Sequence, residues 1–428
     1  MKKFKLTPLE RNWVLYDIGN SAFILLVTTL VPIFFNALAS SAGLNEDLYL
    51  SYWGYAGSVA TILVAIIGPV CGAVSDQNFN KPIFLSTALL GAVGCAVLGF
   101  VSHWLIFLVV FVIARVGYSS SIVFYDSMLP EITTGERMDK VSSSGYAFGY
   151  IGSVIPFVLC LVLVLMPDRF GLTQGSAMTI AFLITALWWL ACTVPLLKDY
   201  RQSAFVRREG SAITDAFRQL GKTLRAVRKE KHIFLFLLSF FFYIDGVYTI
   251  IDMATAYGAA LGLDTTGLLL ALLLTQIVAF PCSIAFGRLS SRFDTGFLIK
   301  ICIIAYTGIV GFAIFLCYQW QFWVLAVAVG MFQGGVQALS RSYLGKIIPA
   351  ERSGEYYGLM DICGKGASFL GLMLVSLVSQ LAAGVEWNLF GMRLQNENIA
   401  ICALLVIFIV GYLLFDKADK LNKARVSV

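Results

Sequence analysis

Long apolar stretches follow one another along almost the whole chain, and only short polar turns separate them. Of the 428 residues, 59% are hydrophobic and 13% are charged, whereas soluble domains carry about a quarter charged residues. A helix needs about 20 apolar residues to cross a bilayer, and its backbone polar groups must be satisfied inside the helix. The pattern therefore predicts an all-α integral membrane protein without a large extramembrane catalytic domain.

Twelve apolar runs between polar turns predict twelve transmembrane helices. They cover residues 12–40, 48–75, 83–102, 104–127, 142–166, 176–196, 233–260, 265–289, 298–318, 321–346, 355–384 and 397–415. We expect an N-terminal six-helix bundle over residues 1–197 and a C-terminal one over 233–428, which ends in a short cytoplasmic tail.

The segment between these bundles, residues 198–232, holds ten Lys and Arg residues and accounts for the net charge of +6. Apolar residues recur in it at intervals of three and four, namely Ile213, Phe217, Leu220, Leu224 and Val227. This spacing predicts a basic amphipathic linker helix on the cytoplasmic membrane surface. Because the basicity is local, it indicates no nucleic-acid partner.

The loop charges predict the orientation in the membrane. With the N-terminus inside, nearly all basic loop residues lie on the cytoplasmic side, and only Arg169 and Arg393 lie outside. Basic loops are retained on the cytoplasmic side during insertion. The sequence therefore predicts a multi-pass protein of the cell membrane with both termini in the cytoplasm, functional as a monomer.

An internal repeat relates the two predicted bundles. A shift of 215 residues aligns Ser127, Leu129, Ile132, Glu136, Arg137, Gly149 and Ser153 with Ser342, Leu344, Ile347, Glu351, Arg352, Gly364 and Ser368. The matching Glu-Arg pairs fall in equivalent loops, so a six-plus-six duplication explains them. Pseudo-symmetric halves with a substrate site near the membrane midplane are typical of secondary transporters.

The residues of common enzyme sites are missing from the sequence. There are two histidines, and the nine cysteines are scattered through apolar runs without a C-x-x-C pair. The sequence also lacks a Walker loop and a G-x-S-x-G elbow. It therefore predicts no metal site, no cofactor and no enzymatic activity.

A signature loop follows the second run, Gly72-Ala-Val-Ser-Asp76-Gln-Asn-Phe-Asn-Lys81. It resembles the G-x-x-x-D-[RK]-x-G-[RK]-[RK] motif of the major facilitator superfamily, with matches at Gly72, Asp76 and Lys81. The resemblance implies that the glycine permits close helix approach and that the aspartate closes a cytoplasmic latch. We place Asp126 and Arg341 in the same predicted latch.

Three further segments resemble one branch of that superfamily. They are Leu15-Tyr-Asp17-Ile-Gly-Asn20-Ser-Ala-Phe23, Phe124-Tyr-Asp126-Ser-Met-Leu-Pro130-Glu131, and Ser340-Arg-Ser-Tyr-Leu through Gly364-Lys-Gly-Ala-Ser-Phe-Leu-Gly371. The branch contains fungal vacuolar amino-acid effluxers associated with autophagy and their bacterial relatives. The resemblance implies efflux or exchange of small solutes without fixing the solute.

Eight ionisable residues lie inside the predicted spans: Asp17, Asp126, Asp245, Asp252, Asp361, Arg115, Arg341 and Lys365. A charge near the bilayer centre costs roughly 2.5–3.5 kcal/mol on insertion scales, so these residues need partners or a water-filled cavity. Three groups share a helix face: Asp17 with Asn20, Asp245 with Asp252, and Gln333 with Gln337 and Arg341.

These residues make up the predicted substrate-binding and proton-coupling site: Asp17, Asn20, Arg115, Asp245, Asp252, Gln333, Gln337 and Lys365. We expect Asp245 and Asp252 to exchange protons, since no base of their own span lies near them. Three alternatives stay open. Asp245 and Asp252 exchange protons, or either one caps a helix end or pairs permanently with a base such as Lys365. Arg115 binds a substrate carboxylate or forms a buried pair with Asp17 or Asp126, and Lys365 reaches the cavity or pairs with Asp361.

The sequence thus predicts a secondary active transporter that works by alternating access. Its partners are a small polar solute, such as an amino acid or related metabolite, protons and the lipid bilayer. The competing hypotheses are a membrane-embedded lipid-modifying enzyme, using Asp17 or Asp126 with Arg115, and a sensor without transport.

Overall fold

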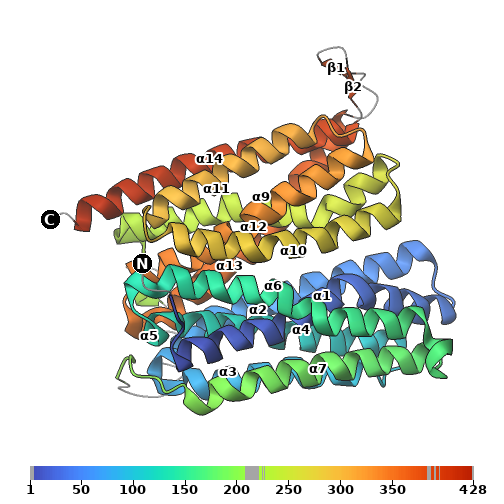
Figure 1. Ribbon diagram of the computed structural model, residues 1–428, viewed down its shortest axis with the longest axis horizontal. Helices are drawn as coiled ribbons and strands as arrows, with labels where there is room; N and C mark the ends of the chain where they lie inside the picture. Colours follow the sequence, from blue (N-terminus) through green and yellow to red (C-terminus); the bar gives the residue numbers. More distant parts are fainter. Residues whose placement is uncertain are drawn as a thin grey trace. The chain divides into compact units, whose positions relative to one another are not determined.

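A computed structural model describes residues 4–207, 221–223, 225, 227–382, 387–389, 392–394 and 396–426. The elements within these residues are almost all helical (Figure 1). The helices of the first half of the chain are α1 (Pro8–Ser41), α2 (Glu46–Val74), η1 (Ser75–Phe79), α3 (Asn80–Leu98), α4 (Trp104–Ser127), α5 (Leu129–Ile132), α6 (Gly135–Leu165), η2 (Pro167–Phe170) and α7 (Gln174–Asp199). Those of the second half are α9 (Lys231–Ala260), α10 (Thr265–Leu289), α11 (Thr295–Ala313), α12 (Gln319–Ile347), η3 (Ala350–Arg352), α13 (Ser353–Ala382) and α14 (Asn396–Val426).

The helical membrane fold predicted from the sequence is confirmed. Within the described residues, ten helical stretches are long and apolar enough to cross a membrane. Many large apolar side chains are exposed on these helices, among them Ile33, Ile66, Leu187 and Val406. Such surfaces suit a chain whose surroundings are lipid, because soluble proteins rarely expose large apolar patches.

A short hairpin departs from the all-helical expectation. Strands β1 (Trp387–Leu389) and β2 (Met392–Leu394) pair antiparallel between α13 and α14, with Trp387 opposite Leu394. The sequence prediction left this stretch as a polar turn because three-residue strands carry too little periodic signal. The predicted linker helix falls mostly outside the described residues, which exclude Ile213, Phe217, Leu220 and Leu224.

The contacts divide the chain into two compact units. Unit 1 comprises Met1–Gly135, Phe148–Leu220 and Pro349–Gly358. Unit 2 comprises Glu136–Ala147, Gly221–Ile348 and Leu359–Val428. The first turns of α6 therefore belong to unit 2, and the first turns of α13 belong to unit 1.

Within unit 1, α3 and α4 pack so closely that they require glycines. A Cβ atom on Gly117 would overlap the backbone of Gly91. Aromatic and hydroxyl contacts join α1 to α4, since Trp13 stacks on Tyr125 at 4.4 Å and the Tyr16 hydroxyl donates to Ser121 at 2.7 Å. These contacts hold the first half of α1 against the second half of α4.

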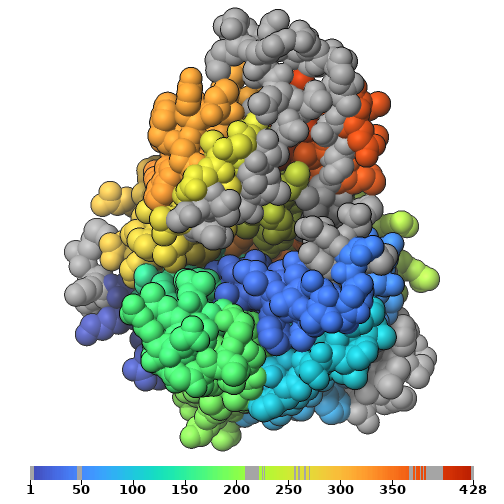
Figure 2. Space-filling model, turned by 90° about the vertical axis from the view of Figure 1, so that its right-hand side faces the viewer, coloured from blue at the N-terminus to red at the C-terminus, as the bar shows by residue number. Residues whose placement is uncertain are grey.

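The two ends of unit 1 differ in what they bring together. At one end, the start of α1 contacts the residue that follows α5 and the end of α7, through the bonds Thr133 to Glu10 and Asn12 to Asp199. The α1–α2, α3–α4 and α6–α7 connections lie at the opposite end (Figure 1). Figure 2 looks onto that end, with the first connection in blue, the second in cyan and the third in green.

Unit 2 packs α9 against α14 and α10 against α12, and α11 contacts both α12 and α14. Local sequence fixes where these helices begin. The side chains of Asp264 and Asp294 cap α10 and α11 by accepting the N–H of Gly267 and Phe297. N-caps of this kind typically stabilise a helix by about 1 kcal/mol.

Candidate functional site

Asp245 lies in the interior of unit 2, on α9, and has no exposed surface. Its Oδ1 atom accepts the backbone N–H of Gly371 at 3.0 Å and the Thr249 hydroxyl at 3.4 Å. The second carboxyl oxygen, Oδ2, has no hydrogen-bond partner within the described residues. A side chain at position 371 would collide with Thr249 and Asp245, so the glycine permits this contact. One oxygen of a buried carboxyl group thus remains for a proton.

Asp252 occupies a different environment from Asp245. It lies two turns further along α9 and is exposed, although it takes part in other interactions. The helix therefore separates the two acids that the sequence pattern grouped. Burial disfavours the charged form of an acid and so favours proton binding, and this effect does not act on an exposed acid.

Arg115 lies halfway along α4 and is half-buried. It forms no hydrogen bond or ion pair with another described residue, so the pairs with Asp17 or Asp126 are not formed in this structure. A guanidinium group stays charged at every accessible pH and matches a carboxylate in two parallel hydrogen bonds. This position can therefore receive an anion.

Asp17 and Asn20 are both buried on α1. The Asn20 side-chain amide donates to the carbonyl oxygen of Tyr16 at 3.1 Å, so one of its hydrogens is held by its own helix. The backbone of Asp17 lies against Gly149 of α6, where a Cβ atom would stand 3.3 Å from the Asp17 carbonyl oxygen. Close packing fixes the place of Asp17 in unit 1.

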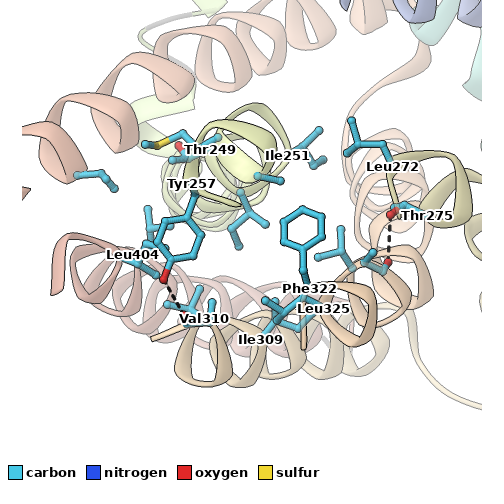
Figure 3. A pocket seen from close by; sticks show the side chains of 18 of the residues that line it. Thr249, Ile251, Tyr257, Leu272, Thr275, Ile309, Val310, Phe322, Leu325 and Leu404 are labelled. Atoms are coloured by element: carbon cyan, nitrogen blue, oxygen red, sulfur yellow. Dashed lines mark hydrogen bonds between the residues drawn. The ribbon is translucent and has the colours of Figure 1, made fainter. Parts of the chain in front are cut away.

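Gln333 and Gln337 are both buried on α12. Gln333 lines a cavity of about 440 Å³ inside unit 2, and Gln337 does not. Figure 3 shows this cavity with the rings of Tyr257 and Phe322 pointing into it. Thr249, the hydrogen-bond partner of Asp245, also lines the cavity.

Lys365 pairs with Asp361 on the same helix, α13. Its side chain keeps 24% of its surface exposed. Of the two sequence alternatives for Lys365, the structure contains the pair along the helix. This pairing neutralises two of the charges that the sequence placed inside a span.

The predicted latch residues Gly72 and Asp76 meet the start of α13 within unit 1. The Asp76 carboxylate accepts the N–H of Gly354 at 2.7 Å and of Glu355 at 3.0 Å. Asp76 is 1% exposed, and the backbones at Gly72 and Gly354 are too close for a Cβ on either residue. Backbone N–H groups at a helix start attract an anion.

Lys81, Arg341 and Asp126 contribute elsewhere. The Lys81 ammonium donates to the carbonyl oxygen of Tyr200 at 3.2 Å. Arg341 belongs to unit 2, where it donates to the hydroxyl and carbonyl oxygens of Ser142 at 2.9 Å each. Asp126 is half-buried at the end of α4. The latch residues of the sequence prediction therefore belong to separate contacts in two units.

Sequence reasoning missed Asp139, which lies in the first turns of α6 within unit 2. Its side chain is 4% exposed and pairs with the Lys346 ammonium at 2.6 Å. It also accepts the Ser342 hydroxyl at 2.6 Å and the Thr295 hydroxyl at 2.7 Å. The available signal was its place beside the repeated Glu-Arg pair, three residues after Glu136.

A second missed group is Glu131, which orders the chain after α7. Its carboxylate accepts the Tyr200 hydroxyl at 3.0 Å and the backbone N–H groups of Ser203 at 2.6 Å and Ala204 at 3.0 Å. Burial, together with the neighbouring Glu131 charge, raises the pKa of the Tyr200 hydroxyl. Tyr200 therefore acts as a hydrogen-bond donor to the carboxylate.

Comparison with known proteins supports a transporter. Residues 48–420 match the family described as "Vacuole effluxer Atg22 like". An uncharacterised transporter of the major facilitator type, YxiO of Bacillus subtilis strain 168, is 36% identical over 433 residues, covering 100% of this chain and 98% of that protein. Autophagy-related protein 22 of Coccidioides immitis is 24% identical over 77% of this chain and 68% of its own length.

Solved structures share the fold at low sequence identity. A bacterial homologue of the iron transporter ferroportin, in an outward-facing state, matches 96% of this chain and 98% of its own with a TM-score of 0.71 and 15% identity. The major facilitator transporter FucP, in an outward conformation, gives a TM-score of 0.71 at 14% identity over 96% of this chain and 98% of its own. The chain is therefore a multi-pass membrane transporter that belongs to the Atg22-like effluxer family of the major facilitator superfamily.

Proposed function

We propose that this chain is a secondary active transporter of a small polar solute that carries a carboxylate, such as an amino acid or a related metabolite. Arg115 carries the proposal, because it is a permanent charge halfway along α4 without a partner among the described residues. An unpaired arginine at the centre of a transmembrane helix costs roughly 2.5–3.5 kcal/mol. A solute carboxylate that pairs with Arg115 offsets this cost only while it is bound.

The test is uptake and counterflow of labelled amino acids and other small carboxylates by the purified protein in proteoliposomes. We expect Arg115→Gln to reduce transport of the carboxylate solute at least tenfold, and Arg115→Lys to raise its KM, because lysine keeps the charge without the two-pronged geometry. Arg169→Gln, at an exposed residue between α6 and α7, is the control. Unchanged carboxylate transport by Arg115→Gln would show that Arg115 does not bind the substrate carboxylate.

We also propose proton coupling through Asp245. The support is its complete burial and the carboxyl oxygen Oδ2 that lacks a partner within the described residues. A proton at this oxygen removes a buried charge, and water reaching Asp245 during the transport cycle releases it again.

Asp245→Asn mimics the protonated acid and tests this role. We expect it to abolish accumulation driven by a pH gradient while solute counterflow continues, because exchange needs no net proton movement. Asp252→Asn, on the exposed acid of the same helix, is the matched comparison. Gradient-driven accumulation by Asp245→Asn at the normal level contradicts the coupling role.

For the membrane arrangement, we propose twelve transmembrane helices in two pseudo-symmetric six-helix bundles, 1–197 and 233–428, joined by the linker 198–232. We place both termini in the cytoplasm of the cell that carries the protein in its membrane. The basic loop residues support this orientation. Exposed Tyr318 and Trp320 at the start of α12 fit a membrane–water interface on the outer side.

Cys317, an exposed free cysteine in the α11–α12 turn, reports this orientation. An impermeant maleimide should label it on intact cells, and Cys317→Ser should lose the label. Labelling that requires permeabilised cells places this turn in the cytoplasm and reverses the proposed topology.

The proteoliposome assay also separates transport from the two other hypotheses. Turnover of a lipid donor without solute flux identifies an enzyme, and solute binding without flux identifies a sensor. The comparisons favour the transporter over both.

A further inference from the structure

The cavity inside unit 2 has an uncharged wall where the structure describes it, in contrast to the charged residues that we assign to the solute site. All six long helices of the unit, α9 to α14, contribute to its wall, and its volume is about 440 Å³. None of the described residues that line it is charged. Cavities of this size that are mostly apolar with a few polar groups are typical of small-molecule sites.

The hydroxyl groups in the wall already have partners. The Tyr257 hydroxyl donates to the carbonyl oxygen of Ala313 at 2.8 Å, and the Thr275 hydroxyl lies 3.0 Å from the carbonyl of Ala271 and 3.2 Å from that of Ala326 (Figure 3). These groups therefore have no hydrogen left to donate to a ligand.

Two of the three glutamines in the wall lie inside the protein, whereas the third, Gln380, is exposed. Gln333 is 6% exposed and Gln276 is half-buried, and neither makes a hydrogen bond within the described part of the chain. An amide without a hydrogen-bond partner is unfavourable in a largely apolar wall, so a polar group inside the cavity stabilises the protein. Lipid tails have no such group, whereas a small molecule with one polar end supplies it.

We propose that this cavity binds a small uncharged molecule with an apolar body and one hydrogen-bonding group, held at that group by Gln333 and Gln276. Because the described lining residues carry no charge, the wall suits an uncharged ligand, in contrast to the carboxylate site proposed at Arg115. Thr249 belongs to the cavity wall and also donates to Asp245. A ligand here therefore contacts the hydrogen-bond partner of the proposed proton site.

The probe is 4-propylphenol, with toluene as an apolar comparison, added to the purified protein in lipid nanodiscs. Binding is measured as the shift of the thermal midpoint Tm with probe concentration. We expect 4-propylphenol to raise Tm by about 3 °C at a concentration of about 100 times Kd. Toluene should bind more weakly because it leaves the amides unpaired.

Three variants locate the site. Ala326→Leu and Ala254→Leu fill the cavity and should abolish the shift, whereas Ala403→Leu adds the same atoms to a residue of α14 outside the cavity wall and should keep it. Gln333→Leu should reduce the shift with 4-propylphenol while leaving that with toluene in place. If one filling variant fails to fold, the other retains the test.

Two results overturn the proposal. The first is a shift that is absent in the unmodified protein, or equal in Ala326→Leu and Ala403→Leu. The second is lipid occupancy, seen by mass spectrometry as one more lipid released from the unmodified protein than from Ala326→Leu, which assigns the cavity to a lipid tail. Neither result affects transport of the carboxylate, so the proposed function stands or fails separately.

Discussion

In both units, a buried aspartate holds the start of a long helix in place. In unit 1 the aspartate lies on a neighbouring segment, whereas in unit 2 it lies on the long helix itself. In unit 1, Asp76 follows α2 and accepts backbone N–H groups at the start of α13. In unit 2, Asp139 lies at the start of α6 and pairs with the Lys346 side chain. The internal shift of 215 residues puts Ser291 in the place of Asp76, and Asp139 in the place of Gly354.

The internal repeat relates a second pair of residues in each unit, and their hydrogen-bond partners also differ between the units. In unit 1, the Asn80 amide donates directly to the Ser127 hydroxyl at 2.7 Å. The equivalent residues in unit 2, Thr295 and Ser342, both donate to Asp139 instead. The repeat therefore retains the place of the contact while changing which group carries the charge. An acid that binds backbone needs glycines for close approach, and one that binds side chains does not.

The largest loss of stability should come from Gly354→Ala, which disrupts the contact between Asp76 and the start of α13 in unit 1. The new Cβ would overlap Ser75, Gly72 and Asp76, and overpacking against backbone costs about 3 kcal/mol. Thermal unfolding measures the loss. Gly57→Ala, where a Cβ meets nothing within 4 Å, is the control and should not lower Tm. Equal midpoints for the two variants would show that this contact needs no glycine.

The second-largest loss of stability should come from Asp139→Asn in unit 2. It leaves the Lys346 ammonium without its counter-charge and turns an amide N–H group toward a hydroxyl donor, for a cost of about 2 kcal/mol because Lys346 is partly exposed. Adding Lys346→Gln should recover part of the loss. Asp168→Asn, at an exposed acid, should leave Tm unchanged. A double variant as unstable as the single one argues against a charge pair.

Asp76→Asn should cost less than Asp139→Asn, at about 1 kcal/mol. The amide oxygen still accepts one backbone N–H, and the variant loses the second bond and the negative charge at the helix start. Parallel unfolding curves in the same detergent compare the two variants. A loss at Asp76 that exceeds the loss at Asp139 would contradict the contrast between backbone and side-chain partners.

The smallest predicted effect is on the pH dependence of stability, and it arises from Asp294 at the start of α11. Burial alone would raise the pKa of Asp294, but the hydrogen bond and charge of Lys423, with nearby backbone N–H groups, outweigh it and hold this pKa below its ordinary value of 3.8. A lowered pKa adds stability above pH 3.8 that is lost as the pH falls through the folded value.

Asp294→Asn should therefore flatten the decline of Tm between about pH 4 and pH 3. Because both side chains of the pair are about half exposed, at 53% and 51%, the change should be a few tenths of a kcal/mol. Tm measured against pH for the two proteins checks it. A steeper acid decline in the variant would reverse the sign.

The sequence predicted the residue types at the candidate site better than their partners. It singled out Asp245 and Arg115 because charges inside apolar runs are conspicuous, and Asp76 because its loop resembles a family signature. It grouped Asp245 with Asp252 by helical spacing, yet one is buried and the other exposed, since spacing gives a face and not its surroundings. It missed Asp139, because this acid stands among other charges in a loop-like stretch.

The sequence by itself determined the lipid environment and the helical secondary structure. Long apolar runs can satisfy their backbone only as helices in lipid, whatever the details of packing. Only the tertiary structure decided which polar groups meet. The partner of a carboxylate is chosen by close approach between residues far apart in the chain, as Asp76 with Gly354 and Asp139 with Lys346 show. The helical pattern fixes each residue's face, but distances and burial arise only when the helices pack.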